Sequence, residues 1–182
     1  MKRDFVPERL DVAAFAEAAT PLEGRDPLQS YSRLAAEASQ PAENTVVQWE
    51  ALGAERGDAG DRAAPWLHLR AEATLPLTCQ RCLGPVDTAL KVDRWFRFAA
   101  DEATAALEDE DADEDVLALS REFNLRALVE DELLMEIPIA PTHDVCPQPV
   151  RLSVADEDFE APGGVRPNPF AVLDGLRTKK PD

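Results

Sequence analysis

Three stretches of the chain alternate apolar and polar residues with a period of two, as β-strands with one buried face do. They cover residues 44–52, 66–77 and 86–99. The middle stretch is the clearest, because leucine or alanine occupies every second position of residues 67–77. The last two stretches are joined by the short segment TCQRCLGP. We therefore predict an antiparallel sheet containing a hairpin whose tip carries two cysteines.

Other stretches show the spacing of amphipathic helices. In residues 125–135, apolar side chains recur at positions 125, 128, 129 and 133, and Asn124 stands where an N-cap is expected. Shorter helices are predicted at residues 10–19, with Asp11 as the cap, and at residues 31–38. The predicted fold class is α+β, a twisted antiparallel β-sheet with one main amphipathic helix and short flanking helices.

The length of 182 residues favours one domain. We place it at residues 1–160 and interpret residues 161–182 as a flexible C-terminal peptide with a short helix. In that peptide Asn168 is a predicted cap before a proline, and Phe170 begins an apolar stripe of three-residue spacing. The peptide either docks on the core or binds a groove of a partner protein.

The net charge of −17 argues against a general nucleic-acid binder, and no DNA partner is expected. The acid is concentrated in residues 101–115, DEATAALEDEDADED, which hold nine carboxylates and no cation. The simplest interpretation is a solvated, mobile acidic loop. The alternative is a tract that mimics RNA or recruits a basic partner.

No apolar run approaches the roughly 20 residues that cross a bilayer. The N-terminal segment MKRDFVPERLDV also lacks the apolar stretch of a signal peptide. These patterns predict a cytoplasmic protein with no membrane partner. Its cysteines are then expected to be reduced thiols or metal ligands rather than disulfides.

All three cysteines belong to short pairs. Cys79 and Cys82 are separated by two residues, and so are His143 and Cys146. Two such pairs with a long insertion are the outline of a Cys3His zinc site. The main alternative is ordinary reduced cysteines near a histidine by chance. A redox dithiol is a third interpretation, although no βαβ pattern frames the pair.

Glu132 falls on the apolar side of the predicted helix 125–135, where an unpaired carboxylate would be costly. We expect a structural ion pair with Arg81, or with Arg70; an exposed position or a catalytic role are the alternatives. The chain contains no GxSxG, HExxH or phosphate-binding glycine loop. A non-enzymatic role is therefore predicted, with a thiol-dependent enzyme as the less favoured alternative.

Three segments together resemble one family. TCQRCLGPV, NLRALVEDELLMEIPIAPTHDVC and RPNPFAVLDGLR look like the YceD family of large ribosomal RNA subunit accumulation proteins. The resemblance implies a bacterial cytoplasmic factor that supports synthesis, processing or accumulation of large-subunit (23S) ribosomal RNA, and hence ribosome assembly. It implies no catalytic residue, and the zinc prediction rests on the cysteine and histidine spacing alone.

Because the chain is strongly acidic, it could act on ribosomal RNA by either of two routes, direct or indirect. RNA contact, if direct, is predicted to use a local arginine patch together with C-terminal residues that include Asn168 and Phe170. The predicted cations are Arg81, Arg94, Arg97, Arg166, Arg177, Lys179 and Lys180. In the indirect route, a zinc-stapled interaction module binds a basic ribosomal or RNA-processing protein.

Overall fold

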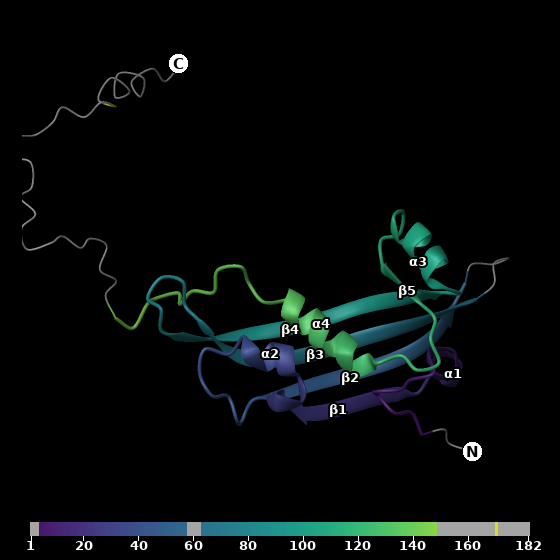
Figure 1. Ribbon diagram of the computed structural model, residues 1–182, viewed down its shortest axis with the longest axis horizontal. Helices are drawn as coiled ribbons and strands as arrows, with labels where there is room; N and C mark the ends of the chain where they lie inside the picture. Colours follow the sequence, from purple (N-terminus) through teal and green to yellow (C-terminus); the bar gives the residue numbers. More distant parts are fainter. Residues whose placement is uncertain (1–3, 58–62, 149–169, 171–182) are drawn as a thin grey trace, which may run out of the picture. The chain divides into compact units, whose positions relative to one another are not determined.

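The computed structural model describes residues 4–57, 63–148 and Phe170. The chain divides into two units, residues 1–149 and 150–182, and every described helix and strand belongs to the first. Its centre is one sheet in the order β1-β2-β3-β4-β5 (Figure 1). The strands are β1 (Pro21–Pro27), β2 (Val46–Arg56), β3 (Ala64–Thr78), β4 (Pro85–Ala99) and β5 (Asp115–Ala118). The predicted domain boundary at residue 160 lies outside the described residues.

The sheet is mixed rather than wholly antiparallel. Neighbours from β1 to β4 are antiparallel, whereas β5 runs parallel to β4, with Phe96 opposite Asp115. The α+β prediction is confirmed, and the prediction of an entirely antiparallel sheet is wrong. The physical reason is the crossover through α3 (Glu102–Asp109), which brings the chain back beside Phe96, near the end of β4, before it enters β5.

The acidic segment 101–115 is not the loop that its charge predicts. Asp101 caps α3 by accepting a hydrogen bond from the Thr104 N–H at 2.8 Å. Arg97 then binds carboxylates on both sides of the turn after α3, Glu108 and, at 2.7 Å, Glu114. This arginine offsets part of the repulsion that would otherwise favour an extended segment.

Three helices lie on one face of the sheet. They are α1 (Val12–Ala18), α2 (Ser32–Ala36), which follows the 3-10 turn η1 (Leu28–Ser30), and α4 (Leu125–Met135). Figure 1 shows α2 and α4 across the strands. The predicted caps are confirmed: Asp11 accepts from Ala14 N–H at 3.1 Å, and Asn124 from Ala127 N–H at 3.0 Å. None of the helices in the described part of the chain could span a membrane.

The core forms between this face and the helices. It contains alternate side chains of β2, β3 and β4 together with Phe15, Leu34 and Val129 from the three helices. The approach of α1 is close enough that a Cβ at Gly53 would lie 2.5 Å from the Phe15 carbonyl oxygen. Alternation therefore leaves the polar side chains of the same strands on the opposite, outer face.

Candidate metal centre

The hairpin between β3 and β4 ends in a tight turn that holds the first cysteine pair. The Cys79 N–H donates to the Gly84 carbonyl and the Leu83 N–H to the Cys79 carbonyl, both at 2.8 Å. Leu83 has φ 60°, the left-handed conformation that a non-glycine residue adopts at some cost. This turn reverses the chain within the few residues between Thr78 and Pro85, so Cys79 and Cys82 face the same point.

The segment after α4 folds back onto this turn. The Gln80 N–H donates to the Pro141 carbonyl at 2.8 Å, and Arg81 donates to the His143 carbonyl at 3.4 Å. The His143 ring also reaches the start of β4, with Nε2 2.9 Å from the Pro85 carbonyl oxygen. These contacts join two parts of the chain that are some 60 residues apart in sequence.

The four predicted ligands come together at this junction. One donor atom from each of Cys79, Cys82, His143 and Cys146 lies within 4.8 Å of all the others. Cys82 Sγ and His143 Nδ1 are 3.4 Å apart. Tetrahedral zinc with ordinary bond lengths would place sulfur and nitrogen ligands about 3.6 Å apart and two sulfurs about 3.8 Å apart. The donor set therefore fits a tetrahedral ion after shifts of about 1 Å or less.

The histidine is in the tautomer that a metal requires. A carbonyl oxygen can only accept, so His143 Nε2 must carry the proton that it shares with Pro85. In the neutral ring this leaves the lone pair on Nδ1, the nitrogen that faces Cys82. A backbone carbonyl behind the ring is a common way to orient a ligating histidine.

The sulfur atoms lie in an environment that stabilises one thiolate. Burial raises the pKa of Cys79, but N–H groups of Cys82, His143 and Arg81 directed at its sulfur lower it more, to about 5. Burial raises the pKa of Cys146, and so do hydrogen bonds and charge from Cys82 and Cys79. One site thus favours a first negative charge and opposes a second, a conflict that a bound dication would remove.

The number of donors matches that of a closed structural zinc site. Four protein donors complete the tetrahedral coordination of zinc and leave no position for water or substrate. Cys79 is fully buried, and the other three ligands are half-buried. All three cysteines are free thiols in the structure. The arrangement suits a metal that holds two segments together.

The predicted ion pair of Glu132 has a different partner. Glu132 is 4 % exposed, and its carboxylate lies 3.4 Å from the guanidinium of Arg94. The prediction of Arg81 is wrong, because Arg81 projects from the hairpin tip and contacts His143 instead. Arg70 is also engaged elsewhere, with Asp93 at 3.2 Å. Strand register decides this outcome, since it places Arg94 on the helix-covered face.

The predicted arginine patch is not a free cationic surface. Arg94 lies among Asp115, Glu132 and Glu136 at 3.4 to 3.7 Å, and Arg97 is held by its two carboxylates. Of the predicted C-terminal contacts, the structure describes Phe170 alone, and it is exposed. The others lie outside the described residues: Arg166, Asn168, Arg177, Lys179 and Lys180.

Sequence reasoning missed the groups that support the metal centre. The Pro85 carbonyl orients His143, and the Pro141 carbonyl ties the two segments through Gln80. The only indication of these groups in the sequence is that both residues are prolines, which lack a backbone N–H and occur where the chain turns. Which carbonyl would be used depends on the folded geometry, which the spacing of ligands does not specify.

Comparison with known proteins places the chain in a family. The family model described as "Large ribosomal RNA subunit accumulation protein YceD" matches residues 67–177, more than half of the chain. The match begins within β3 and includes the hairpin tip, α4 and all four candidate ligands. No solved structure matches the chain. On the strength of this match, the chain belongs to the YceD family.

Proposed function

We propose that this protein is a non-enzymatic factor that supports the accumulation of large-subunit (23S) ribosomal RNA, with a structural zinc ion in its Cys3His site. The family match carries the functional part of the proposal. The convergence of four soft ligands from two remote segments carries the zinc part.

Zinc would fix the position of the segment that follows α4. Without metal, a hydrogen bond from Gln80 to Pro141 and the contacts of His143 hold this segment on the hairpin. Coordination by Cys79, Cys82, His143 and Cys146 would add four bonds across the same junction. The ion would supply no chemical step; it would bind thiolates and hold the two segments in register.

A thiol-dependent enzyme is the weaker alternative. The lowered pKa of Cys79 is a property that nucleophilic cysteines share. Its side chain is fully buried, however, so a substrate could not approach the sulfur without movement of the hairpin tip. A stable thiolate at a buried four-ligand site is better explained by metal binding.

The indirect route to RNA through a basic protein also remains a candidate. It is supported by the ion pairs of Arg94 and Arg97, because carboxylates neutralise these two cations of the predicted arginine patch for RNA. The acidic residues of α3 and the turn after it could attract a basic ribosomal or processing protein.

Deletion of the gene in its host, followed by measurement of both ribosomal RNAs, tests the functional proposal. We expect the amount of 23S RNA to fall relative to 16S RNA and to recover when the wild-type chain is supplied from a plasmid. The 16S RNA is the internal control, because general slowing of growth lowers both. An unchanged ratio would overturn the proposal.

A further inference from the structure

The outer face of the sheet is open in the described part of the chain. Helices α1, α2 and α4 all pack on the opposite face, and α3 lies beside β5 at the sheet edge. Alternation along β2, β3 and β4 directs a second set of side chains to this outer face. An uncovered face of this length is a surface on which another molecule can lie.

One end of the outer face carries an aromatic cluster, defined here as Arg56, Trp66, His68 and Trp95. The His68 ring stacks on Trp95 with 5° between planes and 4.3 Å between centroids. The guanidinium carbon of Arg56 lies 3.4 Å from the Trp95 centroid and 5.3 Å from the Trp66 centroid. Trp66 stands edge-on to Trp95 at 70°. His68 and Arg56 thus both lie against the Trp95 ring, and Trp66 stands edge-on beside it.

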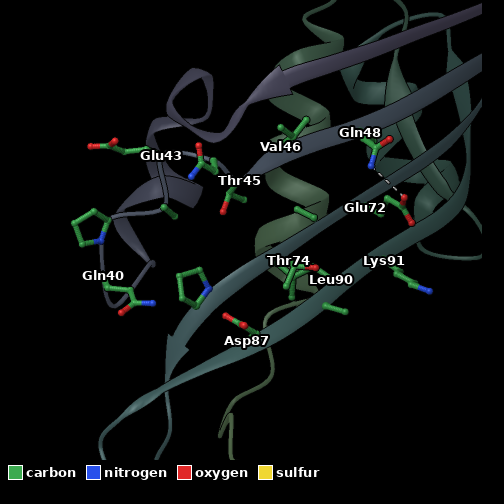
Figure 2. Close-up of a pocket in the computed structure, with 16 residues that line it drawn as sticks. Gln40, Glu43, Thr45, Val46, Gln48, Glu72, Thr74, Asp87, Leu90 and Lys91 are labelled. Carbon is green, nitrogen blue, oxygen red and sulfur yellow. Dashed lines mark hydrogen bonds between the residues drawn. The ribbon is translucent and has the colours of Figure 1, made fainter.

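The outer face is also hollowed along its length. Arg56, Trp66 and Arg97 line a hollow of about 910 Å³ beside the aromatic cluster. A second hollow of about 650 Å³ crosses the middle of the sheet, and a third of about 540 Å³ follows at the far end. Figure 2 shows the third, where Gln48, Glu72 and Lys91 from adjacent strands line its wall. The hollows form a row rather than one deep pocket.

This face carries little of the net negative charge of the chain. Arg97 on this face is neutralised by Glu108 and Glu114. The other charged side chains on outward strand positions are four cations and five carboxylates: Arg25, Arg56, Arg70 and Lys91; Glu23, Glu50, Glu72, Asp87 and Asp93. The chain as a whole carries −17. Among the described residues, no carboxylate forms an ion pair with Arg56, which is exposed. A phosphate chain would therefore meet less repulsion here than on the average surface.

We propose that the outer face binds single-stranded RNA, with unpaired bases stacking on Trp66 and on the Arg56 guanidinium. Flat aromatic and guanidinium groups are the elements with which proteins bind unpaired bases. Arg56 offers a guanidinium plane that already lies on Trp95, so a base would extend an existing stack. The proposal rests on the proposed function, to which it adds direct RNA contact and its location.

Tryptophan fluorescence provides a direct test with the full chain. Trp49 is buried and bonded to Asp26, so the other two tryptophans, Trp66 and Trp95, report on the outer face. Titration with a single-stranded RNA of about 12 nucleotides should quench this fluorescence, and a duplex of equal length should bind at least about 10-fold more weakly. Because few cations take part, the affinity should depend only weakly on salt.

Variants locate the contact. Arg56→Glu and Trp66→Ala should each weaken binding by about 10-fold or more, since one stacked base is lost in either case. Arg9→Ala is the control, because it removes an exposed arginine that pairs with Glu122 away from this face. Circular dichroism checks that each variant is folded, and Arg56→Glu keeps the test valid if Trp66→Ala unfolds. Binding that is absent, or unchanged in both folded variants, would overturn the proposal.

The cellular experiment separates this proposal from the function on which it rests. If deletion lowers 23S RNA and Arg56→Glu fails to restore it, both stand. If deletion lowers 23S RNA but Arg56→Glu restores it fully, direct contact through this face is wrong and the function stands. Crosslinking from position 66 that captures a protein and no RNA would likewise overturn the RNA contact. Deletion without effect refutes the function itself.

Discussion

His143 connects the two parts of the metal centre through both of its ring nitrogens. Nε2 donates to the Pro85 carbonyl, and Nδ1 lies 3.4 Å from Cys82 Sγ. A histidine without a ligand role would not be expected to direct its Nδ1 lone pair at the Cys82 sulfur. Both contacts therefore favour a ligand role, and they make the residue a good probe of metal binding.

The first prediction follows from this geometry. Protein purified without added metal should contain one zinc ion per chain, and Cys82→Ser or His143→Ala should lose it, because three donors hold zinc less tightly than four. Elemental analysis of dialysed protein measures the content. Gln80→Ala is the matched control, since Gln80 lies between the two cysteines and is exposed. Wild-type protein that is purified with no bound zinc would contradict the prediction.

Within the element α4, two carboxylates two residues apart face opposite electrostatic conditions. Burial alone would raise the pKa of Glu130. Hydrogen bonds from Arg33 and from the Leu34 N–H lower it by more than burial raises it, so the net shift is downward. Burial also raises the pKa of Glu132, and Arg94 only partly offsets this. Glu132 Oε2 is buried without a hydrogen bond, although Arg94 is 3.4 Å away.

The lowered pKa of Glu130 predicts that Glu130→Gln destabilises the protein. The Glu130 carboxylate accepts the Arg33 N–H at 2.7 Å and a guanidinium hydrogen bond at 2.9 Å. We expect the free energy of unfolding to fall by about 1–2 kcal/mol at neutral pH. The full difference in unfolding free energy between wild type and variant should be present above the ordinary glutamate pKa. It should vanish as the pH falls through the lowered pKa of the native state. Urea unfolding across this pH range measures it.

The raised pKa of Glu132 predicts the opposite sign for Glu132→Gln. The charged form is the disfavoured one, so wild type loses stability as the pH rises from the ordinary glutamate pKa through the raised native value. The neutral amide avoids this loss, and the variant should be more stable by about 1 kcal/mol at neutral pH and equal to wild type in acid. Equal effects of the two variants at neutral pH would refute the pair of predictions.

The elements that sequence predicts well are those whose own pattern determines them. The alternation in β3 and β4 and the caps Asp11 and Asn124 specify structure locally. Strand β1 is missed because PLEGRDP carries proline at both ends and a central glycine. Gly24 is required by its neighbour, since a Cβ there would lie 2.3 Å from the Trp49 ring. A requirement that comes from a tertiary contact leaves no pattern in the local sequence.

In the candidate site, too, local pattern predicts some features and tertiary contacts determine the others. Ligand spacing predicts which four side chains converge, because zinc ligands come in pairs of fixed separation. The partner of Glu132 and the neutralisation of Arg97 depend on which strand face lies opposite which helix. The aromatic cluster depends on register between β3 and β4, which places Trp95 opposite His68. Pairing across strands is not readable from either strand alone.

At the scale of the described molecule, the candidate metal centre and the hydrophobic core are largely separate. Core residues lie between the sheet and the helices, and of the four ligands only Cys79 is fully buried. The sheet and the packing of α4 therefore have their own source of stability. Zinc should stabilise the hairpin tip and residues 141–148 far more than it stabilises the core.

Removal of zinc should thus loosen the junction without unfolding the protein. With a chelator present, amide exchange at Gln80, which donates to Pro141, should approach the rate of an exposed amide. Amides in the middle of β3 and β4 should keep their protection, because their ladder and the core beneath them contain no ligand. Exchange followed by mass spectrometry measures both regions in one sample, and the strands serve as the control. Global loss of protection would mean that folding of the entire unit is coupled to metal binding.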